Sequence, residues 1–530
     1  MRRREFLAYG AGGATAALFP SWAIAQSASS DTLTIGLGGA VQSLDPHMLV
    51  GIPSNTVTMH MFDRLVDRQP FGQLKPGLAL SWRSVSPTQW EFKLRPGVKW
   101  HDGSDFTSDD VVATIERIRN MPKGAGGYSG FLRPITKVET PDALTLVVDT
   151  DVPSPTIPRD LSNVNITSRK YGIGSTTEDY NSGKAAIGTG PYKYGSYVPG
   201  DRVSFTRNDA WWGTKPDWKE VTIKIITNAP SRTVAILSKD VDIIESPSEN
   251  DLPRLEGSPD VEIKTAPGIQ VYYLYTDYSR EGETPFVFDK NGKPLPKNPL
   301  RDVRVRKALS IAINRQAIAD RIMLKKAKPT GQWLLPGSYS YAPSVEVPKY
   351  DREAAKKMLA EAGYPEGFQI TIHTPSDRYL NDARICQAIA QMWTQAGVKT
   401  SVEALPWNVY ASKSQAQEFA VGFVGWTSVS FDAAYMATSN IATNNKERGT
   451  GLYNRGRYSN PELDDLLTKA AVEIDPDKRE QILIKVVEIA SADVGVIPLV
   501  MPDSVWAVRK GIDFNARSDQ RTLAVEASKA

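Results

Sequence analysis

Cysteine and histidine are scarce in this 530-residue chain, which has one cysteine, Cys386, and four histidines. A single thiol cannot form an internal disulfide, so the fold must be stabilised by core burial, for which a chain of this length is ample. Cys386 lies in a helical pattern with no histidine beside it in the sequence, and we expect a packed thiol rather than a nucleophile. The histidines form no pair at i and i+4 and no H-E-x-x-H motif, so neither a metal site nor a cofactor is predicted. They are His47, His60, His101 and His373.

An excess of charge of one sign is also missing, because 63 Lys and Arg face 60 Asp and Glu. A chain this close to neutral gives no electrostatic reason to expect nucleic acid or an anionic membrane surface as a partner. The sequence lacks the G-x-S-x-G, G-x-x-x-x-G-K-[ST] and C-x-x-C motifs, the simplest signs of a serine hydrolase, an NTPase and a redox enzyme. Binding is therefore a better hypothesis than catalysis, and a secreted hydrolase is the remote alternative.

The N-terminal apolar run is short, because glycines and Pro20 keep it below the roughly 20 residues that a membrane span requires. Residues 1–25 begin with a basic stretch before Phe6-Leu7 and end in Ala23-Ile24-Ala25, which resembles a twin-arginine (Tat) export signal with its cleavage site. No cysteine stands at that site, so a lipoprotein anchor is not expected. We predict a Tat-type signal peptide over residues 1–25 and a mature protein free in the periplasm.

The most informative stretch is residues 89–119, which read QWEFKLRPGVKWHDGSDFTSDDVVATIERIR. Trp90, Phe92 and Leu94 alternate with charged residues, which is the pattern of a half-buried strand. After a turn-rich loop, Thr107 stands where it can cap the first amides of an amphipathic helix. The physical pattern alone indicates a strand, a loop and a capped helix.

Two further segments predict strand–helix–strand units. In residues 221–244 and again in residues 368–404, a period-two apolar pattern is followed by a helical one and then by a second strand. Such spacing favours right-handed crossovers and parallel strand pairs. The chain is therefore expected to contain at least two α/β lobes.

Several sequence motifs carry information beyond these patterns of strands and helices. Besides residues 89–119, they are GTGPY at 188–192, RDVRVRKALSIAINRQAI at 301–318 and YSNPELDD at 458–465. These segments resemble those of the extracytoplasmic solute-binding proteins of peptide, nickel and opine uptake transporters, known as solute-binding protein family 5. The resemblance runs in order along essentially the whole mature chain.

The resemblance implies an α/β, two-lobed periplasmic-binding-protein fold of the cluster C type, with an extra inserted domain and hinge closure around the ligand. Domain I would be discontinuous, formed by residues 26–50, 187–268 and 497–530. Residues 51–186 would form the small inserted domain II, and residues 269–496 the second lobe, domain III. Closure would couple ligand affinity to a conformation that a transporter recognises.

The family also suggests where a solute binds. The loop after the strand at residues 419–426 lines the cleft in this family, and peptide-binding members commonly place there an aspartate that pairs with the α-ammonium. Aligning on Trp426 puts Val429 at that position, which argues against ordinary peptide recognition. Asp432 could take the role if the loop bends inward, or it could instead cap a helix. The candidate ligand-binding residues of this loop are Trp426, Thr427, Ser428, Val429, Ser430 and Asp432.

Arg378 is the second anchor that the sequence suggests. It lies between a strand end and a helix start, where ligands of α/β folds tend to bind, and a guanidinium there could hold a carboxylate bidentately. The alternative is a surface pair with Asp377 or Asp382. Aromatic walls are expected from Trp407, Trp426 and Tyr275. Main-chain hydrogen bonds from domain I are expected from Ala40, Val41 and Gln42.

The sequence thus predicts the substrate-binding component of an ABC importer. It would capture a small peptide or peptide-like solute between the lobes and deliver it to a cognate permease in the inner membrane. A non-peptide solute, such as an oligosaccharide, an opine or a metal chelate, is the alternative that Val429 favours. We expect a monomer with no catalytic residues.

Overall fold

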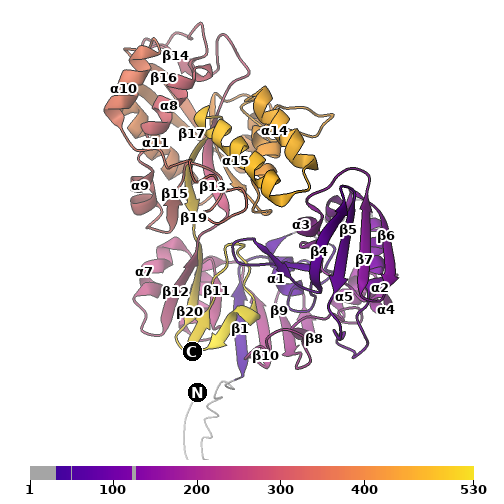
Figure 1. Cartoon of the computed structure of the whole chain (residues 1–530). Helices are drawn as coiled ribbons and strands as arrows, with labels where there is room; N and C mark the ends of the chain where they lie inside the picture. Colours follow the sequence, from indigo (N-terminus) through magenta and orange to yellow (C-terminus); the bar gives the residue numbers. More distant parts are fainter. Residues whose placement is uncertain (1–30, 49–50, 122–126) are drawn as a thin grey trace, which may run out of the picture.

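Figure 1 shows the computed structural model, which describes residues 31–48, 51–121 and 127–530. Two large lobes lie one above the other, and a smaller domain lies beside the lower one. The predicted signal peptide, residues 1–25, lies outside the described residues. Within the described ranges, no helix is both long and apolar enough to cross a membrane.

The lower, first lobe is built on a seven-stranded sheet of order β12-β20-β11-β1-β10-β9-β8. Its central strand β1 (Thr32–Leu37) pairs in parallel with β10 (Glu220–Ile225) on one side and β11 (Ile243–Glu245) on the other. The predicted unit over residues 221–244 is thus present, with β1 inserted between its two parallel strands. Helix α6 (Ala229–Leu237) makes the crossover. The other strands are β8 (Tyr192–Val198), β9 (Arg202–Arg207), β12 (Val261–Ala266) and β20 (Ser504–Arg509).

The small domain has an antiparallel sheet of order β4-β5-β7-β6. Trp90, Phe92 and Leu94 on β5 (Gln89–Leu94) are buried, as their alternation predicts. Helix α2 (Ser108–Arg119) begins with a reciprocal capping box between Thr107 and Asp110. The remaining elements are β2 (Val66–Arg68), β3 (Leu74–Pro76), β4 (Ala79–Ser86), β6 (Ile135–Asp142), β7 (Thr145–Thr150), α3 (Ile157–Leu161) and α4 (Arg169–Gly172). Helices α1 (Ile52–Thr58) and α5 (Thr177–Asn181) instead pack Val57 and Tyr180 against the core of the first lobe.

The second lobe is a mixed sheet of order β14-β16-β18-β13-β19-β15, with β17 on the free side of β16. Strands β16 (Phe368–Pro375) and β17 (Val398–Leu405) run parallel and are joined by α11 (Asp382–Gln395), which confirms the second predicted unit. Cys386 on α11 is fully buried in the core of this lobe. The other elements are β13 (Gln270–Thr276), β14 (Val287–Phe288), β15 (Ala327–Pro329), β18 (Val421–Thr427), β19 (Ile497–Pro502), α8 (Val303–Ile311), α10 (Arg352–Glu361), α12 (Trp407–Gln415), α13 (Ala433–Met436), α14 (Pro461–Val472) and α15 (Pro476–Ala492).

Two neighbouring chain crossings join the lobes, from β12 to β13 and from β19 to β20. They touch, because a Cβ at Gly268 would lie 2.0 Å from the carbonyl oxygen of Pro502, so only glycine fits there. Strand β19 pairs with β13 and β15 and therefore belongs to the second lobe. This corrects the expected start of the last domain I segment, which moves from residue 497 to a position after Pro502. Two adjacent crossings form the geometry of a hinge.

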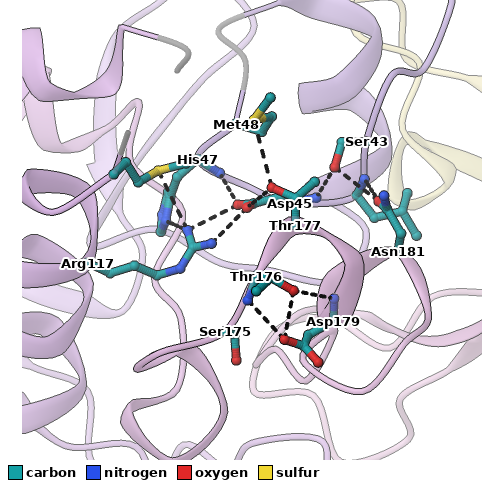
Figure 2. Close-up of polar contacts among 12 residues, drawn as sticks. Ser43, Asp45, His47, Met48, Arg117, Ser175, Thr176, Thr177, Asp179 and Asn181 are labelled. Atoms are coloured by element: carbon teal, nitrogen blue, oxygen red, sulfur yellow. Dashed lines mark hydrogen bonds and ion pairs between the residues drawn. The ribbon is translucent and has the colours of Figure 1, made fainter. Parts of the chain in front are cut away.

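The boundary between the first lobe and the small domain, which we call the seam, is held by buried polar groups (Figure 2). The carboxylate of Asp45 accepts two hydrogen bonds from the guanidinium of Arg117, at 2.7 and 3.0 Å. Burial acts to raise the pKa of Asp45, but the paired guanidinium outweighs it and holds that pKa below its usual value. Across the same boundary, the amide oxygen of Asn181 accepts hydrogen bonds from the Ser43 hydroxyl and the Leu44 N–H.

Three histidines complete the seam, each with one ring nitrogen donating to a carbonyl and the other accepting from an N–H; His47 and His60 are buried and His101 is half-buried. The donor bonds run from His47 to Asn165, from His60 to Thr56 and from His101 to Gly190. The accepted bonds come from Arg117, Ala524 and Gly188 in the same order. This arrangement requires neutral imidazoles. Burial, the leading cause, lowers the pKa of each of the three to about 4. The seam therefore joins the first lobe and the small domain into one body at neutral pH.

Candidate functional site

A hollow of about 330 Å³ opens in the second lobe at the end where β18 finishes and β13 begins. Gln270, which lines it, lies two residues beyond the hinge glycine Gly268. The hollow therefore lies beside the crossings that join the two lobes. Its lining comes from Gln270, Tyr273, Arg378, Tyr379, Trp407, Val424, Gly425, Trp426, Thr427, Val429, Tyr435, Asn440, Tyr453 and Arg455.

Five of the residues that the sequence suggested are brought together here: Arg378, Trp407, Trp426, Thr427 and Val429. They come from the loop after β16, the start of α12 and the end of β18 with its following loop. Parallel strands β16 and β18 end at the same edge of the sheet, which explains why residues about 50 positions apart in the chain meet.

The guanidinium of Arg378 is exposed and has no hydrogen bond or ion pair within the described part of the chain; it lies over the ring of Trp407, 5.1 Å from the ring centroid. The expected alternative, a pair with Asp377 or Asp382, does not form. Asp377 accepts from the N–H of Trp407, and Asp382 accepts from the N–H groups of Arg378 and Tyr379. These carboxylates are used at the loop and the helix start, so the Arg378 side chain remains available.

Tyr275 does not line the hollow, contrary to expectation. It is buried, and its hydroxyl shares a hydrogen bond of 2.7 Å with the hydroxyl of Ser414. Tyr273, two residues earlier on the same face of β13, lines the hollow instead. The period-two pattern placed both tyrosines on one face, but their depth in the lobe depends on the length of the strand that leads from the hinge.

Asp432 does not line the hollow, so the structure gives no support to its expected role as an ammonium partner. One of its oxygens accepts from the N–H of Ala434 at 2.7 Å, which makes it the cap of α13. The other accepts from the guanidinium of Arg479 at 2.7 Å, and the side chain is 3% exposed. Asp432 therefore occupies the position of the expected alternative, the cap of a helix.

The loop between β18 and α13 is held from outside by the small domain. Arg68 donates to the carbonyl of Val429 at 2.8 Å, and Arg159 donates to the carbonyl of Ser430 at 2.5 Å. Ser428 is buried and its N–H donates to the carbonyl of Ile269. The loop therefore presents the exposed side chain of Val429 to the hollow, while the neighbouring backbone oxygens are occupied.

The first-lobe segment at residues 40–42 does not reach the hollow either. Ala40 and Gln42 are exposed elsewhere, and the carbonyl of the buried Val41 accepts from the hydroxyl of Tyr197 at 3.1 Å. The structure thus gives no support to the expected main-chain hydrogen bonds from this segment.

The sequence reasoning missed a second arginine of the hollow, Arg455, whose guanidinium has one hydrogen bond within the described residues, to the side chain of Gln415 at 3.5 Å. It stands just before the YSNPELDD motif, where no local pattern indicates a turn back to the hollow. Aromatic residues were also missed: Trp426 packs against Tyr435 and Tyr453, with ring centroids 5.6 and 5.4 Å apart. The tyrosines follow no recognisable spacing relative to Trp426.

The chemistry of this lining favours binding over catalysis. It contains two guanidiniums, amides and aromatic rings, but no histidine, cysteine, serine or carboxylate that could act as a general base or an activated nucleophile. Among the residues that the structure describes, no cluster of three His, Cys, Asp or Glu could hold a metal ion. What the hollow offers is charge, hydrogen-bond donors and flat apolar faces.

Comparison with known proteins agrees with this geometry. The family model of the bacterial extracellular solute-binding proteins, family 5, matches residues 73–447. The dipeptide-binding protein of Escherichia coli (strain K12) is 26% identical over 487 residues, covering 87% of each chain. The heme-binding protein A of Haemophilus influenzae is 25% identical over 472 residues, covering 84% of this chain and 82% of that protein.

Solved structures extend the likeness to the whole fold. HbpA2 from Haemophilus parasuis overlays with a TM-score of 0.81 at 22% identity, covering 94% of this chain and all of that one. The murein tripeptide-binding protein MppA in its unliganded open form overlays with a TM-score of 0.80 at 22% identity, covering 95% of this chain and 98% of that one. The two-lobed periplasmic-binding-protein fold is thereby established, and the chain belongs to the bacterial extracellular solute-binding proteins, family 5.

Proposed function

We propose that this protein is the periplasmic solute-binding component of an ATP-driven importer, and that it holds a small peptide or peptide-like solute in the hollow of the second lobe. The observation that carries the proposal is the guanidinium of Arg378, which has no hydrogen bond or ion pair within the described residues and lies over Trp407 beside the hinge. A planar guanidinium without an internal partner matches a solute carboxylate in two parallel hydrogen bonds.

Closure of the lobes supplies the rest of the mechanism. The two touching crossings at Gly268 and Pro502 let the first lobe and the small domain move as one body toward the second lobe. Closure would remove water from the solute and strengthen its contacts with Arg378. The closed form is then the state that a membrane permease recognises, so solute binding and delivery are coupled. The protein would act as a monomer after removal of residues 1–25.

A non-peptide solute is the second candidate, and Val429 is the observation that favours it. The position at which peptide-binding members commonly carry an aspartate has an apolar side chain, and the nearest carboxylate of that loop, Asp432, is paired with Arg479. A secreted hydrolase receives no support from the lining, which contains neither a histidine nor a carboxylate to act as a general base.

Native mass spectrometry of gently purified protein, followed by thermal-shift screening of peptides, opines and sugars, tests the proposal. A bound solute should appear as an added mass, and the matching compound should raise the melting temperature by mass action. The variant Arg378→Ala should lose this shift for a carboxylate-bearing ligand. Arg352→Gln removes an arginine of the same lobe that pairs only with neighbouring Glu353, so it provides the matched control. Turnover of a substrate panel by the purified protein would contradict the proposal.

A further inference from the structure

We infer that the solute is acidic at both ends: one carboxylate meets Arg378, a second meets Arg455, and the ammonium of an ordinary peptide has no place in the hollow. This inference rests on the proposed function, because it names the chemical class of solute that the same hollow takes. It depends on an imbalance of charge and of hydrogen-bond donors in the lining.

The charge imbalance comes from the two arginines. Arg378 and Arg455 are the charged residues among those that line the hollow, and this lining contains no carboxylate. Neither guanidinium has an ion pair in the described part of the chain, and Arg455 has only the long contact with Gln415. Two unpaired positive charges near one cavity repel each other, and an anionic solute relieves this repulsion.

The carboxylates closest in sequence to the lining form no ion pair with the two lining arginines in the described structure. Asp377 and Asp382 bind main-chain N–H groups at the loop and at the start of α11. The buried carboxylate of Asp432 forms an ion pair with the guanidinium of Arg479. The guanidinium N–H donors of the two lining arginines therefore remain available to a solute carboxylate.

The neutral groups of the lining point to the same class of ligand. The amide nitrogen of Asn440 and the indole nitrogen of Trp426 are buried and have no hydrogen-bond partner in the described structure. The amide oxygen of Asn440 is already used, because the hydroxyl of Tyr273 donates to it at 3.1 Å. Both unpaired nitrogens are hydrogen-bond donors. A ligand rich in acceptor oxygens would accept hydrogen bonds from them after small side-chain adjustments.

An ammonium group would meet the opposite environment. The side chain at the rim is Val429, and the carbonyls of Val429 and Ser430 already accept hydrogen bonds from Arg68 and Arg159. These two small-domain arginines also add positive charge behind the rim. A free N-terminal amine therefore finds repulsion and few free acceptors there, whereas a carboxylate finds donors.

The experiment compares three compounds that differ only at their amino end: free Ala-Ala, N-acetyl-Ala-Ala and N-succinyl-Ala-Ala. Their amino ends carry a positive charge, no charge and a negative charge, while the C-terminal carboxylate is the same in all three. Isothermal titration calorimetry of the wild-type protein should show the tightest binding for the succinyl compound and the weakest for the free dipeptide, with about tenfold or more between each step.

Variants of the two arginines show which arginine binds which end of the ligand. Arg455→Gln should abolish the advantage of the succinyl over the acetyl compound and leave the acetyl compound nearly unchanged, whereas Arg378→Gln should weaken all three. Arg455→Lys retains the charge and should keep part of the advantage, which guards against a folding defect in the glutamine variant. Arg352→Gln is the charge-matched control and should reproduce the wild-type order. Melting temperatures without ligand should agree among all variants.

The outcomes separate this inference from the function on which it rests. Tightest binding of free Ala-Ala, or an Arg455→Gln variant that keeps the full succinyl advantage, overturns the acidic solute and leaves a peptide-binding importer component standing. If the three compounds fail to bind but another small molecule co-purifies and stabilises the protein, the inference also falls and the proposed function stands. If no small molecule binds, both fall.

Discussion

Arginines occur both at the seam, between the first lobe and the small domain, and in the hollow of the second lobe. They differ in burial and in pairing. At the seam, Arg117 is 8% exposed and donates to Asp45 and His47. In the hollow, Arg378 is exposed and has no hydrogen bond or ion pair within the described residues. A guanidinium that is buried and paired stabilises the fold, whereas one left unpaired in a cavity awaits a partner from outside.

The two boundaries also differ in how they are joined. The seam is held by an ion pair and by hydrogen bonds to buried groups, among them Asp45 and His60. The two lobes are joined by the adjacent crossings at Gly268 and Pro502, and the hollow lies beside them. The following variants test whether the contrast between the seam and the hollow holds, from the largest expected effect on stability to the smallest.

Arg117→Ala should lower the free energy of unfolding by about 3–5 kcal/mol, because it leaves the carboxylate of Asp45 buried without its partner. Urea denaturation followed by circular dichroism measures the change. The double variant Asp45→Asn/Arg117→Met removes both charges and should recover most of the loss. A loss below about 1 kcal/mol for the single variant, the value of an exposed pair, would remove the distinction between the seam and the hollow.

Acidification should weaken the seam through its histidines. His60 has a pKa of about 4 in the folded protein, because burial disfavours its charged form, against an ordinary value of 6.5. A lowered folded-state pKa contributes stability that is present above pH 6.5 and is lost as the pH falls through 4. The loss from His60 amounts to up to about 3 kcal/mol, since one pKa unit corresponds to about 1.4 kcal/mol.

Urea denaturation at several pH values between 4 and 7 measures this dependence. Asp63, whose pKa burial raises to about 6, contributes the opposite trend, with stability lost as the pH rises from 3.8 through 6. The difference between the wild type and His60→Gln isolates the histidine, and the variant should lose less stability on acidification. Parallel pH curves for the two proteins would show that His60 does not titrate as the seam geometry requires.

Arg159→Ala should have an intermediate effect, about 1.5–3 kcal/mol, because a charged donor loses its hydrogen bond to the carbonyl of Ser430. Arg159→Lys keeps the charge and serves as the control. Denaturation gives the stability, and calorimetry with the best ligand shows whether the rim at Val429 has shifted. An unchanged stability would mean that the small domain does not hold this loop in solution.

Arg378→Ala should change the free energy of unfolding by less than about 0.5 kcal/mol, because the exposed side chain has no hydrogen bond or ion pair within the described residues and loses only its contacts with the rings of Tyr379 and Trp407. The same variant should weaken the binding of a carboxylate ligand by at least about tenfold. Denaturation and calorimetry on one preparation measure both quantities. A large loss of stability would place Arg378 with the structural arginines of the seam and break the comparison.

Local patterns predicted much of the fold because the interactions that create it are short in sequence. The alternation of Trp90, Phe92 and Leu94, the capping box at Thr107 and the unit from β16 to β17 all appear as expected. The expected domain boundary at residue 497 was misplaced because β19 joins the sheet of the second lobe by pairing with β13, which lies more than 200 residues earlier in the chain. No local pattern reports such a pairing.

The candidate site was predicted in part for the same reason. Arg378 and Trp426 stand at strand ends, where α/β folds place their ligands, so their position was visible in the pattern. Asp432 was ambiguous because its partner Arg479 lies 47 residues further along the chain. Arg455 and Asn440 were missed because they return to the hollow from segments with no distinctive spacing.

The sequence by itself determined the elements, the family resemblance and the type of lobe, because strand alternation, helix caps and turn residues act over a few positions. Only the tertiary structure decided which polar groups are paired. Asp45 meets Arg117 across 72 residues, and His60 meets Ala524 across 464. Arg378 and Arg455 are left without an ion pair among the described residues, because burial and pairing are set by which distant segments come together when the chain folds.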